Sequence, residues 1–146
     1  MLDKEEVISF IHNIKVPFSK DIYGGLAKAT GLMGLSKEGV VLEFEIGEAI
    51  FDSKLIKSDV KYRVIPFREI DYINLKKGLF FTTLTIRTKG LKALSDIPGS
   101  HQAEVKFRIP RKCRNIASEF VSCVVLKISE HEIEKIQGQN LNLLDS

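Results

Sequence analysis

Nucleophilic catalysis needs a serine or cysteine with a base held beside it, and histidine is the usual base. The cysteines are Cys113 and Cys123, and the histidines are His12, His101 and His131. The three histidines fall in three different kinds of segment. Cys113 stands at the expected entry to a helix without an evident base, and Cys123 lies on the apolar stripe of that helix. We therefore predict no catalytic residues and no enzymatic activity.

Metal sites and phosphate-binding loops also have characteristic spacings. The two cysteines and three scattered histidines lack the short pair spacings of a zinc site. The glycines at 24–25, and those at 31 and 34, lack the Lys-Ser/Thr ending of a phosphate loop and the strand-to-helix context of a dinucleotide turn. We predict neither a bound metal nor a cofactor.

The distribution of charge is more informative than the net charge of +3. Residues 1–53 sum to −4, residues 54–114 to +10 and residues 115–146 to −3. A basic block between acidic flanks favours an anionic partner, or else pairing between blocks that lie side by side in the fold. If it binds, the predicted anion- or partner-binding residues are Lys54, Lys57, Lys61, Arg63, Arg108, Arg111 and Arg114.

The expected cellular location follows from the cysteines and the apolar runs. Cys113 and Cys123 are too far apart along one helix to form a disulfide, so they are expected to be free thiols, as in a reducing compartment. The first residues are acidic where a secretory signal would be basic. No run of about eighteen apolar residues is present. We expect a cytoplasmic protein.

The N-terminal residues predict a short amphipathic helix in a segment that we place at 1–18. Asp3 and Glu6 have the spacing of a capping box. The apolar residues then recur with helical spacing, and Pro17 is expected to end the helix. These residues are Val7, Phe10, Ile11 and Ile14.

From Tyr23 to about Pro110 the apolar residues alternate with polar ones, as in antiparallel strands. Around Val60, Tyr62 and Val64 they alternate with cations, which are expected to face solvent. Gly47-Glu48 is expected to turn the chain. The strand candidates are 26–31, 40–46, 49–56, 60–67, 70–75, 79–89 and 102–109.

After Pro110 the helical period returns, on a stripe that includes Ile116 and Phe120. This apolar helix must pack on the sheet. A separate, more polar helical turn is expected before Gly138, within an extension that we place at 129–146. The apolar residues of its tail are Leu141, Leu143 and Leu144.

Four short motifs resemble those of a family of bacterial pleckstrin-homology-like domains of unknown function. They are Val41-Leu42-Glu43-Phe44-Glu45, Ile65-Pro66-Phe67-Arg68-Glu69-Ile70, Lys76-Lys77-Gly78-Leu79-Phe80 and Ile97-Pro98-Gly99-Ser100. The likeness implies a mainly β fold, with a barrel of about seven antiparallel strands capped by a C-terminal α-helix and, here, an extra short N-terminal helix. We place this domain at 22–128. Its motifs are packing and turn signals and carry no chemistry.

The same resemblance disfavours a phosphoinositide ligand. Members that bind inositol lipids carry cations on the second strand, where this chain has Glu43 and Glu45. We therefore expect a non-catalytic interaction module that binds a protein segment or associates with itself, using apolar surface at both ends of the chain. The alternative is electrostatic binding of anionic lipid or nucleic acid by the basic 54–114 surface.

Overall fold

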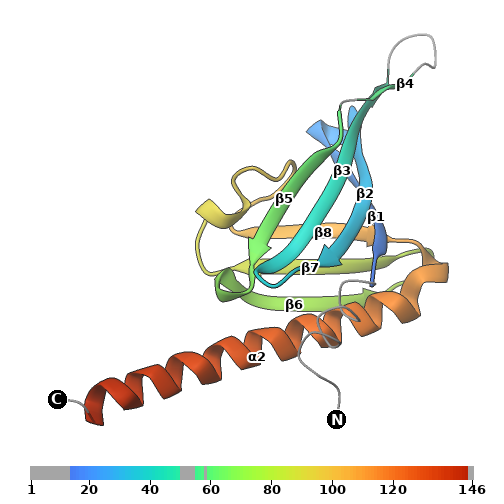
Figure 1. The fold of residues 1–146 in the computed structure, drawn as a ribbon. Coiled ribbons are helices and arrows are strands. Elements are labelled where there is room, and N and C mark those ends of the chain that lie inside the picture. Colours follow the sequence, from blue (N-terminus) through green and yellow to red (C-terminus); the bar gives the residue numbers. More distant parts are fainter. Residues whose placement is uncertain (1–13, 50–54, 58, 145–146) are drawn as a thin grey trace.

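The structure, a computed structural model, describes residues 14–49, 55–57 and 59–144 (Figure 1). Within them the chain forms eight strands and one long helix. The strands are β1 (Val16–Ile22), β2 (Ala27–Leu35), β3 (Gly39–Ala49), β4 (Leu55–Lys57), β5 (Lys61–Pro66), β6 (Ile70–Lys77), β7 (Thr82–Thr88) and β8 (Glu104–Ile109). Helix α2 spans Arg114–Leu144, and the short 3-10 turns are η1 (Tyr23–Gly25), η2 (Phe67–Glu69), η3 (Lys92–Leu94) and η4 (Arg111–Cys113).

All eight strands belong to one antiparallel sheet. Seven of them have the order β4-β3-β2-β1-β8-β7-β6, and β5 pairs with β3 beside this path. Strand β3 is long enough to pair with both β5 and β4, which follow one another along its outer edge. Strands β1 and β8 join the two halves of the sheet through the pair Ser19 and Arg108. In Figure 1 the strands β2, β3 and β5 run steeply, whereas β6, β7 and β8 run across beneath them.

The predicted barrel is wrong in one respect, because the sheet does not close. The strand path ends at β6, and among the described strands neither β4 nor β5 pairs with it. Helix α2 packs instead against β6 and against η2, the turn that connects β5 to β6. Strand β5 ends at Pro66, which has no N–H to donate to a further strand.

The core lies between the two halves of the sheet and the first half of α2. Alternate residues of β1, β2, β3, β7 and β8 are mostly buried, as the period of two predicts, whereas in β6 an irregularity between Ile70 and Tyr72 interrupts the alternation. From the helix, Ala117, Phe120 and Val124 are fully buried in the same cluster. The helix therefore completes the core at the side that the strands leave open.

The N-terminal segment differs from the prediction. Most of the expected helix, residues 1–13, lies outside the described residues. Val16, Pro17 and Phe18 are in strand β1, and Ile14 is buried in the core. Pro17 is tolerated because at this position β1 pairs with Leu32 of β2 and has no pair on β8 within the described register.

Two further expectations about chain direction are also wrong. Gly47 and Glu48 do not turn the chain but extend β3, where they pair with β2 and β4. The separate second helical turn is absent from the described region, since α2 continues through Gly138 to Leu144. In Figure 1 the last part of α2 projects beyond the sheet. None of the described helices has the length and apolar character needed to span a membrane.

Candidate functional site

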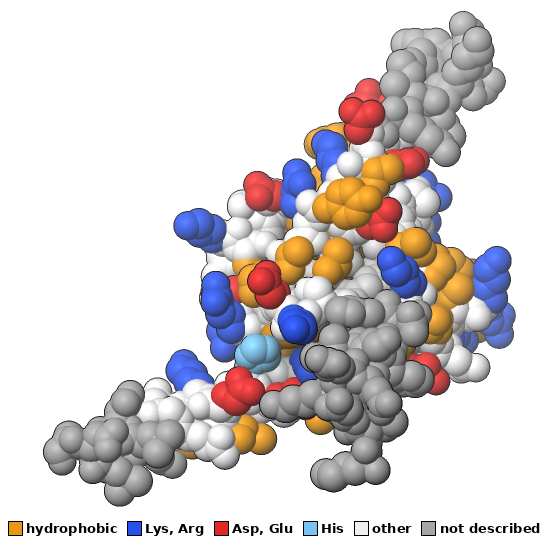
Figure 2. Space-filling view, viewed as in Figure 1, with side chains coloured by type: hydrophobic (Ala, Val, Ile, Leu, Met, Phe, Trp, Pro, Cys, Tyr) orange, Lys and Arg blue, Asp and Glu red, His pale blue; other side chains and the backbone are white. Residues whose placement is uncertain are grey.

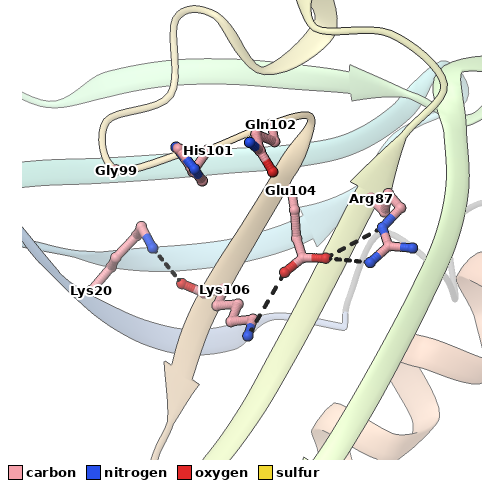
Figure 3. Close-up of a pocket in the computed structure, with 7 residues that line it drawn as sticks. All are labelled: Lys20, Arg87, Gly99, His101, Gln102, Glu104 and Lys106. Carbon is pink, nitrogen blue, oxygen red and sulfur yellow. Dashed lines mark hydrogen bonds and ion pairs between the residues drawn. The ribbon is translucent and has the colours of Figure 1, made fainter.

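A shallow polar pocket opens where β1 and β8 diverge beyond their single residue pair (Figure 3). Its volume is about 450 Å³. The lining combines strand residues with the loop that precedes β8. The lining residues are Lys20, Arg87, Gly99, His101, Gln102, Glu104 and Lys106.

Glu104 is the acidic group among these side chains, and it lies between two cations. Its Oε2 atom is 2.7 Å from Nη2 of Arg87, and its Oε1 atom is 3.7 Å from Nζ of Lys106. Figure 3 shows this chain of contacts across β7 and β8. The hydrogen bonds from Arg87 are the main reason that the pKa of Glu104 lies below its ordinary value. Glu104 therefore stays ionised and holds both cations in place.

Lys20 closes the opposite side of the pocket. Its Nζ atom donates a hydrogen bond to the carbonyl oxygen of Lys106 at 2.9 Å. Partial burial is the main cause that lowers the pKa of Lys20, and repulsion from Lys106 lowers it further. Gly99 has a left-handed φ of 75°, and a Cβ there would lie 2.5 Å from Cε of Lys20. The glycine thus lets the loop approach the lysine stem.

The loop between Gly99 and β8 is conformationally unusual. Gln102 and Ala103 have φ values of 51° and 62°, in the left-handed region that non-glycine residues seldom adopt. Hydrogen bonds between the backbones of His101 and Glu104, in both directions, hold the turn. The described contacts of these cations are with Glu104 and with the Lys106 carbonyl, and they leave N–H donors of Arg87, Lys20 and Lys106 available for a small anion.

The predicted binding cations lie on two different parts of the sheet. Lys61 and Arg63 are on β5, at the outer edge of β3. Arg108, Arg111 and Arg114 lie at the end of β8 and the start of α2. Lys54 is outside the described residues, and of Lys57 the structure gives the backbone pairing with Gly47.

Arg108 and Arg114 each have partners within the protein. Arg108 lies 3.4 Å from Oδ2 of Asp21 and has its guanidinium 4.5 Å from the centre of the Phe81 ring. Arg114 donates to the Thr82 hydroxyl and to the Gly78 carbonyl. These contacts support the internal-pairing alternative for part of the basic block.

Strand β5 has the opposite polarity from the one expected. Val60, Tyr62 and Val64 are 44%, 61% and 44% exposed, whereas Lys61 and Arg63 are partly buried. Residues paired across an antiparallel ladder share a face, so Arg63 lies on the same face as its fully buried partner Leu42. Its Nε atom is buried and has no hydrogen-bond partner within the described part of the chain.

The apolar side of β5 continues across the outer face of the sheet. Val64 pairs with Val41, and Tyr62 pairs with Glu43. The Tyr62 hydroxyl donates to Oε1 of Glu43 at 3.3 Å, and the charge of Glu43 raises the pKa of Tyr62. Beyond Val41 the face is hollowed by about 230 Å³. The hollow is lined by Lys15, Leu32, Gly34, Leu35, Val41 and Glu43.

His12 lies outside the described residues, and the described cysteines and histidines are not gathered in one place. Cys123 is partly buried on α2, and burial, with a smaller contribution from Glu119, raises its pKa. His131 faces the Phe67 ring at 5.8 Å between ring centres, and His101 lines the polar pocket. The described residues contain no group of three or more His, Cys, Asp or Glu that could hold a metal ion.

Comparison of the chain with protein-family models, with curated proteins and with solved structures found no match.

Proposed function

We propose that this chain is a non-catalytic interaction module, and that the outer face of β5 binds an apolar, extended protein segment. The observation that carries the proposal is the inverted polarity of β5. An edge strand that exposes Tyr62 and Val64, next to the exposed Val60 that precedes it, while it partly buries Lys61 and Arg63 sacrifices stability in the isolated domain. A partner on this face would remove the three apolar side chains from water.

The free edge of the sheet suggests how the segment binds. Among the described strands β5 pairs with β3 alone, so the part of its other edge that the contacting turn η3 leaves open can pair with an added strand. Alternate side chains of the added strand would then lie beside Tyr62 and Val64. The hollow beyond Val41 extends the same surface.

The fold is compatible with an interaction role. The order of antiparallel strands followed by one long helix that packs on the open side of the sheet is consistent with pleckstrin-homology-like topology. This likeness concerns architecture, so the function rests on the β5 surface.

The experiment is a selection from a displayed library of random peptides against the wild-type protein. Peptides that depend on the proposed surface should bind the double variant Tyr62→Ser/Val64→Ser at least about ten-fold more weakly, because two exposed apolar contacts are lost. Hydrogen exchange of the β5 backbone amides should slow when the peptide binds. A matched control is Val125→Ser, which removes a comparably exposed apolar side chain from α2.

Two results would contradict the proposal. One is that the selected peptides bind the β5 double variant as well as they bind the wild type. The other is that protection from exchange appears elsewhere while the β5 amides are unchanged.

Self-association is a second candidate, supported by a different observation. Ile133 and Ile136 are 54% and 56% exposed on the part of α2 beyond its buried stretch. Their spacing places them on one helix face, as in helix pairs. Sedimentation velocity over a micromolar range should show a dimer that Ile133→Glu/Ile136→Glu dissociates; a monomer at every concentration would exclude this candidate.

The alternative of electrostatic binding to anionic lipid or nucleic acid is supported by exposed cations. Arg111 and Lys112 are exposed at the start of α2. Binding that depends on such cations weakens steeply with added salt. Gel-shift titrations with duplex DNA at low and high salt test the nucleic-acid form, and no shift at low salt would exclude it.

A further inference from the structure

The turn between β6 and β7 presents the most exposed large apolar side chains of the described structure. Leu79 and Phe80 are 83% and 87% exposed, and Phe81 is 43% exposed. The turn is closed by a hydrogen bond from the Gly78 amide to the Phe81 carbonyl at 3.1 Å. Three consecutive apolar residues at the end of a hairpin carry an energetic cost in water, so their exposure calls for a partner.

The turn is attached firmly to the body of the protein. Arg114, at the start of α2, donates to the Gly78 carbonyl and to the Thr82 hydroxyl, on either side of the exposed residues. The guanidinium of Arg108 lies over the Phe81 ring. Leu79 and Phe80 therefore project from a braced turn, and their exposure follows from the fold.

Exposed cations surround the base of this turn. Lys76 and Lys77 precede it on β6, and both are exposed. Arg111 and Lys112 are exposed in η4. Just before η4, Ile109 pairs with Thr82, and just after it Arg114 donates to the Gly78 carbonyl. The backbone of η4 is therefore close to the turn. We call Lys76, Lys77, Arg111 and Lys112 the collar.

Within the described part of the chain, few acidic groups oppose the collar. Residues 72–89 and 105–118, the two stretches that form this end of the protein, contain no Asp or Glu. The acid that approaches them from β1 is Asp21, which is paired with Arg108. Figure 2 shows hydrophobic side chains flanked by Lys and Arg at the right-hand border, where Figure 1 places the β6–β7 turn and the start of α2.

We propose that this end of the protein docks on an anionic lipid bilayer, with Leu79 and Phe80 inserted at the boundary between headgroups and acyl chains and the collar against the lipid phosphates. A bilayer fits the geometry because it can receive a convex apolar tip, whereas a protein partner must supply a matching cavity. It also fits the charge, since anionic headgroups attract clustered cations. The proposal is independent of the β5 surface, which lies on another part of the sheet.

Co-sedimentation of the full chain with vesicles tests the proposal. We expect binding to vesicles that contain phosphatidylglycerol and little binding to pure phosphatidylcholine. The variant Leu79→Ser/Phe80→Ser should bind the anionic vesicles at least about ten-fold more weakly. Lys76→Gln/Lys77→Gln should lose roughly five-fold per charge at low salt. Because all four side chains are exposed, these variants should retain the wild-type thermal unfolding midpoint.

Matched controls separate this surface from the rest of the protein. Tyr62→Ser/Val64→Ser removes apolar side chains from β5, and Lys37→Gln/Lys92→Gln removes exposed cations from other loops. Both controls should bind anionic vesicles as the wild type does. Equal losses in the control and the turn variants would overturn the proposal, as would the absence of binding at low salt.

Insertion can be observed directly because the chain contains no tryptophan. In Phe80→Trp the single indole should shift its emission to the blue when anionic vesicles are added, and brominated lipids should quench it. Tyr62→Trp should show neither effect. If Phe80→Trp shifts without vesicles as protein concentration rises, and Leu79→Ser/Phe80→Ser converts a dimer to a monomer, the turn is a protein interface and the membrane proposal fails.

Discussion

Arg114 donates a hydrogen bond from Nε to the hydroxyl oxygen of Thr82 at 2.8 Å, across 32 residues of sequence. Thr82 is fully buried, so this bond satisfies a hydroxyl that water does not reach. The same guanidinium also donates a hydrogen bond to the Gly78 carbonyl oxygen. One side chain at the start of α2 thereby connects the helix to the β6–β7 hairpin.

Replacing Arg114 by Met should lower the free energy of unfolding by about 1.5–3 kcal/mol, because the Thr82 hydroxyl would lose its charged donor. Urea denaturation gives the measurement. Thr82→Val in the Arg114→Met background should cost less than in the wild type, with a coupling of at least about 0.5 kcal/mol. Strictly additive losses would show that the bond contributes nothing to stability.

Glu104→Gln should destabilise the protein at neutral pH and have a smaller effect in acid. Arg87 holds the pKa of Glu104 in the folded protein below 4.5, its ordinary value. The carboxylate therefore contributes its full stabilisation above 4.5, and the contribution is lost as the pH falls from there through the lowered folded pKa. Urea midpoints of both proteins across this range should converge towards low pH; a constant difference would contradict the assignment.

The hydroxyl of Tyr62 should ionise more easily in Glu43→Gln than in the wild type. The negative charge of Glu43 opposes formation of a second negative charge and keeps the pKa of Tyr62 above 10.0. Removal of that charge should move the pKa of Tyr62 down towards this value. Ultraviolet difference spectra in alkaline buffers follow the change, with Tyr62→Phe identifying the signal.

Phe120→Ala should lower the free energy of unfolding by about 3–5 kcal/mol, since the side chain is fully buried between α2 and the sheet and its loss leaves a cavity. Val125→Ala, on the exposed side of the same helix, should change it by no more than about 0.5 kcal/mol. Similar losses at both positions would mean that α2 does not complete the core.

Gly31→Ala should destabilise the protein by at least about 3 kcal/mol or prevent folding, because strand β3 would have to move. A Cβ at Gly31 would lie 1.9 Å from the carbonyl oxygen of Glu43, its neighbour on β3. Gly90→Ala is the matched change, since a Cβ there meets no atom within 4 Å. Thermal unfolding of the two variants compares them, and equal midpoints would contradict the packing.

The sequence predicts most strands and the long helix because their apolar periods are strong. It does not reveal β1, since Pro17 next to a helical pattern resembles a helix end, whereas in the fold Pro17 pairs with Leu32 of β2 and has no pair on β8. Gly138 predicts a helix end that the structure does not have. A single glycine in an exposed helix destabilises it by only about 1 kcal/mol and need not end it.

The binding surfaces could be predicted less well than the fold. Alternation along β5 shows that the strand has an apolar face and a cationic face, but it does not show which of them lies inward. The pattern predicts that the cations face solvent, whereas in the structure Tyr62 and Val64 do. The sequence pattern predicts Leu79 and Phe80 to be in a strand, whereas the hydrogen bond between Gly78 and Phe81 places them in a turn. In both cases the neighbours that decide exposure are distant in sequence.

The pairing of Ser19 with Arg108 also determines when the protein can fold during synthesis. Strand β1 is among the first described residues to leave the ribosome, yet its partner on one side is the last strand to be made. Contacts between such distant segments form slowly, because the intervening chain must first be closed into a loop. We therefore expect nascent chains that end before Ile109 to expose core residues of β1 to β3 until β8 and α2 emerge.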